Sequence, residues 1–217
     1  MSGNLQNAIV ELNEEVALSL VKERIEAGKE PESIIEALSS GMQTVADRFE
    51  REEYGLAELH MASEIYNESV KLVESKFKAP PVLGKIVLGQ AAARLKDYGR
   101  EAVAGVLKAS GFEVYDLGED VSGERFAAKA REVNADVVAI CGLQSTNVEA
   151  ARSAVSEIRA SGATAKILVG PGISCGCQIV VDDKMRQMVG ADAAWNRVRE
   201  AVDLAKSVVK KQEAALA

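Results

Sequence analysis

The hydrophobic pattern of this chain changes once, at residues 77–84 (FKAPPVLG), and the change separates two kinds of structure. After it, short apolar runs alternate with amphipathic segments. Strands are expected at 85–88, 113–117, 136–141, 166–169 and 191–195. Helices are expected at 97–109, 123–133, 147–160, 179–189 and 196–211. The alternation predicts a flavodoxin-like, doubly wound α/β domain whose five parallel strands follow the order 2-1-3-4-5 with right-handed crossovers.

Before the change, apolar residues recur every three or four positions, which is the period of a helix. In the first segment these residues include Leu5, Ile9, Val16 and Leu20. The pattern predicts a cap of about four antiparallel helices over residues 1–78. Adjacent prolines cannot continue a helix, so 79–84 is expected to be a Pro-rich linker that leads into an α/β domain at 85–217.

The composition narrows the functional classes. The 217 residues carry a formal net charge of −7, whereas nucleic-acid binding needs clustered positive charge. No apolar run reaches the roughly 18 residues of a membrane span. The first residues are acidic and amphipathic and do not resemble a signal peptide, so a cytoplasmic location is expected. The three cysteines have no disulfide-framework spacing.

In open α/β sheets, ligands bind where the strands end. The segments that follow the first, third and fourth expected strands are 90–96, 141–147 and 170–177. We therefore expect these three segments to line the ligand site.

Several segments resemble one known family. They are 52–59 (EEYGLAEL), 84–99 (GKIVLGQAAARLKDYG), 111–118 (GFEVYDLG), 134–138 (NADVV) and 190–192 (GAD). Together with the two-part layout, they are similar to the corrinoid proteins of methylamine, methanol and aryl-ether methyltransferase systems. The resemblance extends over nearly the whole chain.

The resemblance implies a bound cobalamin, base-off, between the cap and the α/β domain. It implies a protein that carries a methyl group on cobalt between substrate-specific and acceptor methyltransferases, as a corrinoid subunit rather than a self-sufficient enzyme. No nucleic-acid or membrane partner is expected, and a homodimer is left open. The implied cofactor-binding residues are Met61, Gln90, Arg94, Lys96, Asp97, Gly99, Cys141, Leu143, Ser145, Thr146, Gly170 and Gly172.

The chain departs from the family at its signatures. The family motif Asp-x-His-x-x-Gly reads Arg94-x-Lys96-x-x-Gly99, so the lower-axial histidine is replaced by a lysine, which has no lone pair when protonated. Pro171 also stands in the usual Gly-Gly turn. The alternative is a binding or regulatory module on the same fold that holds a metal, another tetrapyrrole or a small anion.

Two further sets of residues have alternative interpretations. His60, the only histidine, lies off the apolar stripe of its expected helix, and is either an upper axial cobalt ligand or a surface residue. Cys141, Cys175 and Cys177 are expected near the same edge of the sheet. They suit a soft metal or an iron–sulfur centre, or are ordinary small apolar residues.

Overall fold

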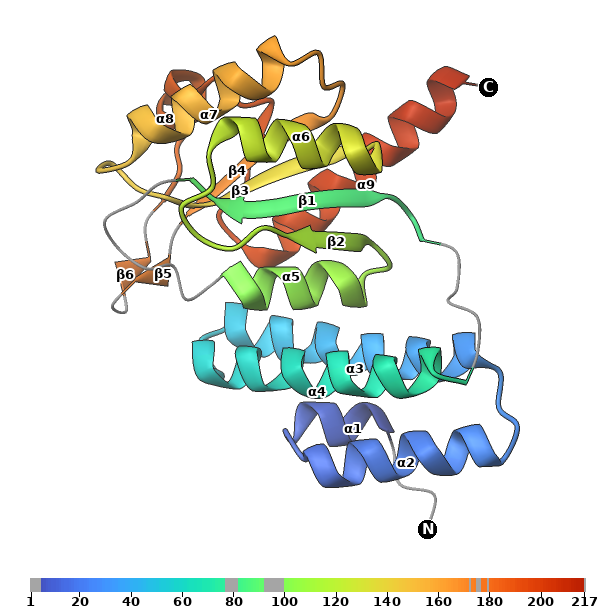
Figure 1. Ribbon diagram of the computed structural model, residues 1–217. Coiled ribbons are helices and arrows are strands. Elements are labelled where there is room, and N and C mark those ends of the chain that lie inside the picture. Colours follow the sequence, from blue (N-terminus) through green and yellow to red (C-terminus); the bar gives the residue numbers. More distant parts are fainter. Residues whose placement is uncertain are drawn as a thin grey trace. The chain divides into compact units, whose positions relative to one another are not determined.

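The computed structural model describes residues 5–76, 82–91, 100–171, 173–174, 177–178 and 180–216 (Figure 1). The backbone forms two compact units. One comprises residues 1–81 with 108–110, and the other comprises 82–107 with 111–217. The expected linker at 79–84 lies partly outside the described residues.

The first unit is helical. Its elements are α1 (Leu5–Val10), α2 (Glu14–Glu26), α3 (Pro31–Glu50) and α4 (Leu56–Glu74). Pro31 occupies the first turn of α3, where the missing N–H costs nothing. The carboxylate of Glu58 accepts the N–H of Gly55 at 2.8 Å and so closes the start of α4. The helices α1 and α4 each pack against both α2 and α3, around fully buried residues such as Ile34, Leu38 and Leu59.

The apolar stripe of α2 differs from the expected one. Val16 is 43% exposed, whereas Ala17 and Val21 are fully buried. The sequence pattern was read as one continuous segment, but α1 ends at Val10 and Leu12 adopts a positive φ of 57°. The turn resets the rotational phase, so the helix that follows buries a different face.

The second unit contains a five-stranded parallel sheet in the order β2-β1-β3-β4-β7, as predicted. Its strands are β1 (Lys85–Gln90), β2 (Glu113–Asp116), β3 (Val137–Leu143), β4 (Lys166–Pro171) and β7 (Ala193–Ala194). The central strand β3 is buried along its whole length, as a strand covered on both faces requires.

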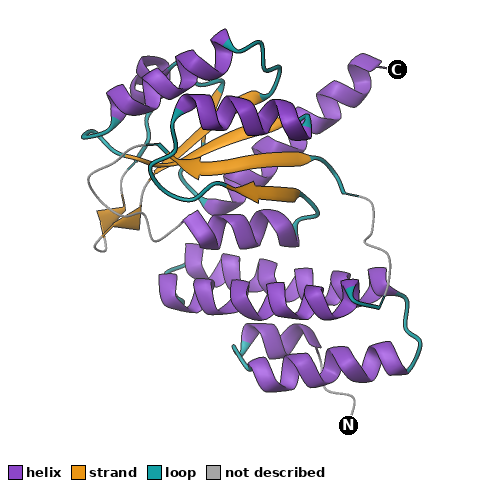
Figure 2. Cartoon of the chain, in the orientation of Figure 1, coloured by secondary structure: helices purple, strands orange, loops and turns teal. Residues whose placement is uncertain are grey.

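Helices cover both faces of this sheet (Figure 2). They are α5 (Arg100–Ala109), α6 (Gly123–Val133), α7 (Val148–Ala160), α8 (Asp183–Val189) and α9 (Val198–Leu216). The helices α6, α7 and α8 share one face and its core, while α5 and α9 lie on the other face (Figure 1). This arrangement brings the carboxyl ends of all five strands to one edge.

Two local predictions were wrong. The helix expected at 179–189 begins at Asp183, because the side chain of Asp182 accepts the N–H of Met185 at 2.7 Å and caps it there. The loop expected after β4 contains a short antiparallel hairpin, β5 (Ile173–Ser174) with β6 (Cys177–Gln178).

Candidate functional site

The exit of β2 lies along the end of β1. The Gln90 N–H donates to the carbonyl of Gly118 at 2.9 Å, and the Gln90 carbonyl accepts the N–H of Val121 at 2.9 Å. Asp116, the last residue of β2, accepts the N–H of Gly118 at 2.9 Å and pairs with the buried guanidinium of Arg100 at the start of α5. This network fixes the ends of β1 and β2 against each other.

Strand β3 contains a bulge at the same edge. Ile140 pairs with Val169, but Leu143 pairs with Pro171, so β3 has one extra residue between these pairs. Gly142 in this bulge has a φ of +75°, which side chains rarely tolerate. A methyl group on Gly142 would lie 2.7–2.9 Å from the carboxamide of Gln90. The buried side chain of Gln90 therefore lies directly on the bulge.

One asparagine closes the loop that follows β3. Asn147, 4% exposed, accepts the N–H of Gln144 at 2.7 Å and donates to the carbonyl of Gly142 at 2.9 Å. Because both polar atoms of Asn147 hold the loop, Ser145 and Thr146 are turned outward and are exposed. The loop thus presents two hydroxyl groups on a fixed backbone.

The end of β4 is covered by an indole. Trp195 follows β7 and is 3% exposed. Its backbone N–H donates to the carbonyl of Val169 at 3.0 Å. A methyl group built on Gly170 would overlap the indole. Only glycine at this position leaves room for the ring against the backbone.

The structure brings part of the predicted site together. Gln90, Cys141 and Gly170 lie buried at the ends of β1, β3 and β4, next to the exposed Ser145 and Thr146. Leu143 differs, since its side chain is fully buried in the core shared with α6 and α7. The predicted residues Arg94, Lys96, Asp97, Gly99 and Gly172 lie outside the described residues.

The two predicted residues of the cap belong to α4. The His60 side chain is 37% exposed, and its Nε2 lies 3.6 Å from Oε1 of Glu64, one turn further along the helix. Met61 is 46% exposed. Both side chains lie off the buried stripe, which contains Leu59, Ala62 and Val73.

The cysteine hypothesis stays a prediction. Cys141 is 2% exposed, Cys175 lies outside the described residues, and only the backbone of Cys177 is described. Within the described part of the chain, no three His, Cys, Asp or Glu side chains come together as a metal site. In the same part of the chain, none of the helices has both the length and the apolarity needed to cross a bilayer.

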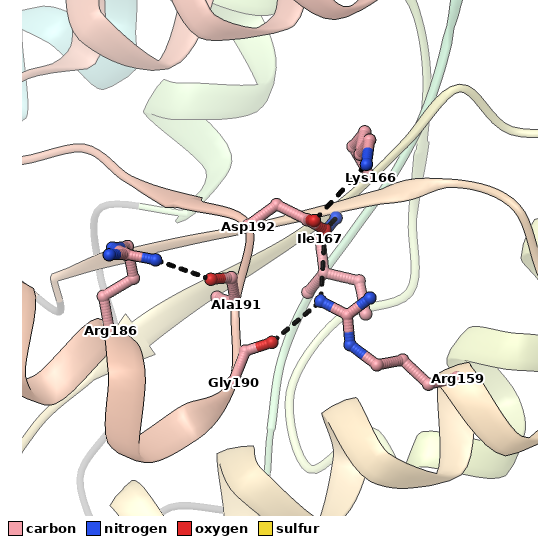
Figure 3. Close-up of polar contacts among 7 residues, drawn as sticks. All are labelled: Arg159, Lys166, Ile167, Arg186, Gly190, Ala191 and Asp192. Atoms are coloured by element: carbon pink, nitrogen blue, oxygen red, sulfur yellow. Dashed lines mark hydrogen bonds and ion pairs between the residues drawn. The ribbon is translucent and has the colours of Figure 1, made fainter.

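The opposite, amino edge of the sheet carries charge (Figure 3). Asp192, just before β7, accepts the N–H of Ile167 at 2.8 Å and pairs with Arg159 at 3.3 Å and Lys166 at 3.5 Å. Burial raises the pKa of Asp192, but the Ile167 N–H and the two cations outweigh it and hold that pKa below its ordinary value. The charged cluster joins strands and lies away from the strand-end residues described above.

Sequence reasoning missed two features of the carboxyl edge. Trp195 was expected only as the end of a strand, although it is the single tryptophan of the chain. The pair of Arg100 and Asp116 was not expected at all.

Comparison with known proteins first defines a class. Models of the B12 binding domain match residues 3–74 and 84–174. The crystal structure of a cobalamin-binding protein from Desulfitobacterium hafniense superposes with a TM-score of 0.72 at 26% identity, covering 94% of this chain and 96% of that one. The methanol:cobalamin methyltransferase complex MtaBC from Methanosarcina barkeri shares the fold, with a TM-score of 0.81 at 22% identity, covering 95% and 78%.

Curated relatives then define the family. Dimethylamine corrinoid protein 1 of Methanosarcina mazei is 32% identical over 209 residues, covering 94% of each chain. Dimethylamine corrinoid protein 3 of Methanosarcina acetivorans is 32% identical over 206 residues, again covering 94% of each. The chain belongs to the corrinoid proteins of methyltransferase systems.

The strand-end residues fit the ring of such a cofactor. A corrin ring is flat and carries amide groups around its rim, which donate and accept hydrogen bonds without carrying charge. The ends of β1 and β3 carry the buried amides of Gln90, Gln144 and Asn147, and the exposed hydroxyls of Ser145 and Thr146. Hydroxyl groups both donate and accept, so they suit an amide rim.

Proposed function

We propose that this protein binds a corrinoid base-off at the carboxyl edge of its sheet and carries a methyl group on cobalt between a substrate-specific and an acceptor methyltransferase, without a lower-axial histidine. The observation that carries this proposal is the neutral, hydrogen-bonding edge formed at the ends of β1 and β3, in a chain of this family. A bound corrinoid supplies the cobalt chemistry, and the protein supplies orientation and electrostatics.

The protein's own residues act by position. The contacts of Asn147 with Gln144 and Gly142 hold the β3 loop, so that Ser145 and Thr146 would be offered to the rim of a bound ring on a fixed backbone. Pre-organised donors lose little entropy on binding, which favours affinity. Arg100 and Asp116 have a related role, since their pairing fixes the β2 exit loop onto β1.

Reconstitution tests the proposal. The purified protein is incubated with hydroxocobalamin, freed of excess cofactor and examined by visible absorbance. We expect about one corrinoid per chain, with a base-off spectrum. A protein that stays colourless after this treatment contradicts the proposal and favours the alternative, a module that holds another ligand.

The absence of a lower ligand has its own test. Lys96→Ala is expected to leave the spectrum of the bound corrinoid unchanged, because a protonated amine offers no lone pair to cobalt. The double variant Arg94→Asp, Lys96→His restores the family motif and is expected to shift the spectrum toward a histidine-ligated form. A spectral change with Lys96→Ala alone would show that this lysine ligates the metal.

We assign His60 the role of upper axial ligand within the same proposal. The carboxylate of Glu64 lies near its ring, and a carboxylate that orients an imidazole is the usual neighbour of a metal-binding histidine. His60→Ala is expected to change the spectrum of the bound corrinoid, because the cobalt loses this ligand. The matched control is Lys71→Ala, an exposed residue of the same helix with no assigned role in binding. Identical spectra for wild type and His60→Ala from pH 5 to 8 contradict the assignment.

A further inference from the structure

The indole of Trp195 lies against the backbone of Gly170 at the end of β4. Gly170 has no side chain, and the space that its methyl group would take is already filled by the five- and six-membered rings of the indole. Trp195 is also 3% exposed, so the ring is enclosed rather than lying loosely over the edge. A fully buried tryptophan accounts for about 150–250 Å² of contact surface.

The residues on both sides hold this tryptophan in place. The backbone N–H of Trp195 donates to the carbonyl of Val169 at 3.0 Å and so continues the pairing of β4 with β7. The next residue, Asn196, accepts the N–H of Val181 at 2.7 Å and donates to the carbonyl of Val181 at 3.1 Å. Because the backbone is fixed before and after it, the indole is a built part of the edge and not a mobile side chain.

The size of the indole has a chemical consequence. The nucleotide tail of cobalamin ends in dimethylbenzimidazole, a fused pair of five- and six-membered aromatic rings, as an indole is. A base of this shape needs a side-chain-free surface to lie flat on, and Trp195 already covers that surface at Gly170. At the neighbouring strand, the carboxamide of Gln90 covers Gly142 in the same way.

We infer that this protein recognises the corrin ring and not the nucleotide base, because Trp195 takes the place of a bicyclic base at the end of β4. This inference rests on the proposed function and narrows it to a ligand class. A corrinoid without a lower base therefore binds at least as tightly as cobalamin. The selectivity of the site lies in the ring and its amides.

Paired titrations test the inference. Aquacobalamin and diaquacobinamide, which has the same ring but no nucleotide tail, are titrated into the full-length protein and followed by visible absorbance. We expect diaquacobinamide to bind at least as tightly as aquacobalamin, because cobalamin must release its base from cobalt to bind base-off and the site offers that base nothing in return. Cobalamin binding that is tighter than cobinamide binding by about threefold or more overturns the inference but leaves the proposed function standing. Failure of both corrinoids to bind overturns the proposed function, and the inference with it.

The second measurement compares cobalamin and cobinamide affinities in variants that lack the full indole of Trp195. Trp195→Gly is expected to tighten cobalamin binding by about tenfold relative to cobinamide, because the base gains an apolar surface. Trp195→Phe, which keeps one ring, serves if the glycine variant fails to fold, and is expected to move the ratio in the same direction. The control Phe126→Leu alters another buried aromatic, packed on Gly89 of β1, and leaves the ratio unchanged. A ratio that stays the same in both Trp195 variants overturns the inference.

Binding of a free base tests directly whether removal of the indole opens a space for it next to Gly170. Free dimethylbenzimidazole is expected to raise the thermal midpoint of Trp195→Gly and to leave the wild-type midpoint unchanged, because only the variant has room for it. A rise of similar size in the wild type would show that a base site exists elsewhere, and would also overturn the inference.

Discussion

The two edges of the sheet are built from different chemistry. At the amino edge, Asp136 accepts the N–H of Lys85 at 2.8 Å and Asp192 accepts the N–H of Ile167 at 2.8 Å, so carboxylates join neighbouring strands. At the carboxyl edge, an amide lies on Gly142 and an indole lies on Gly170. The amino edge is held by charged hydrogen bonds. The carboxyl edge has one ion pair, between Arg100 and Asp116 at the end of β2, but at β3 and β4 neutral side chains fit against glycine.

This difference separates stability from ligand recognition. A carboxylate that pairs with a backbone N–H has a strong and local partner, and it gains little from any further ligand. Packing against glycine is sensitive to shape, so it determines which groups enter the edge. We therefore expect substitutions at the amino edge to change stability alone, and substitutions at the carboxyl edge to change stability and ligand selectivity together.

The largest expected effect is at the carboxyl edge. Trp195→Ala is expected to lower the free energy of unfolding by about 3–5 kcal/mol, as loss of a buried aromatic does. Gly170→Ala in the wild type is expected to cost about 1–3 kcal/mol, because the new methyl group overlaps the indole. In the Trp195→Ala background the same methyl group has room, and its cost is expected to fall below about 0.5 kcal/mol. Denaturant unfolding of the four proteins measures this cycle, and strict additivity would show that the two residues do not share space.

The next effect is at the amino edge. Asp136→Ala and Asp192→Ala are each expected to lower the free energy of unfolding by about 1.5–3 kcal/mol, because each leaves a backbone N–H without its charged acceptor. The Asp→Asn variants keep an acceptor oxygen and are expected to lose less. Denaturant unfolding measures both, and corrinoid affinity serves as the second readout. A change in affinity without a change in stability would contradict the division between the two edges.

The amino edge is also where the sequence was most informative. Asn134-Ala135-Asp136 precedes β3 and Gly190-Ala191-Asp192 precedes β7, so the same three-residue pattern occurs twice. In both places the first residue adopts the left-handed conformation that ends a helix, with a φ of 52° at Asn134 and 81° at Gly190. Local residues fix these helix ends. The expected starts of β1, β2 and β4 agree with the structure, whereas β3 begins one residue later than expected and β7 two residues later.

The carboxyl edge depends on residues that are far apart in the chain. The indole of Trp195 meets Gly170, and the amide of Gln90 meets Gly142, across gaps that the hydrophobic pattern does not encode. The bulge in β3 has the same origin, since its one extra residue appears only when β3 and β4 are paired. Sequence reasoning therefore located the edge but not the side chains that cover it.

Acid sharpens the comparison through Asp192 at the amino edge, whose pKa is shifted. The pKa of Asp192 is held below its ordinary value, so its ionised form stabilises the folded state above the ordinary aspartate pKa of about 4. That stability is lost as the pH falls from there through the lowered pKa. The difference in unfolding free energy between wild type and Asp192→Asn is therefore expected to shrink from about pH 5 to about pH 2. Trp195→Phe is the control, and its difference from wild type is expected to stay constant over the same range.

The smallest expected effect concerns the cations around Asp192. Lys166 is 55% exposed and its Nζ lies 3.5 Å from Asp192, whereas Arg159 also donates to the carbonyl of Gly190 at 2.8 Å. Exposed ion pairs contribute little, so Lys166→Ala is expected to cost at most about 0.5 kcal/mol, and Arg159→Ala somewhat more. At about 1 M salt the Lys166 effect is expected to vanish, since exposed charges are screened within about 3 Å. If Lys166→Ala instead cost as much as Asp192→Ala, the amino edge would be held by charge pairing and not by the hydrogen bond to Ile167. In that case ion pairs between side chains would stabilise the amino edge, and the backbone hydrogen bond of Asp192 would contribute little.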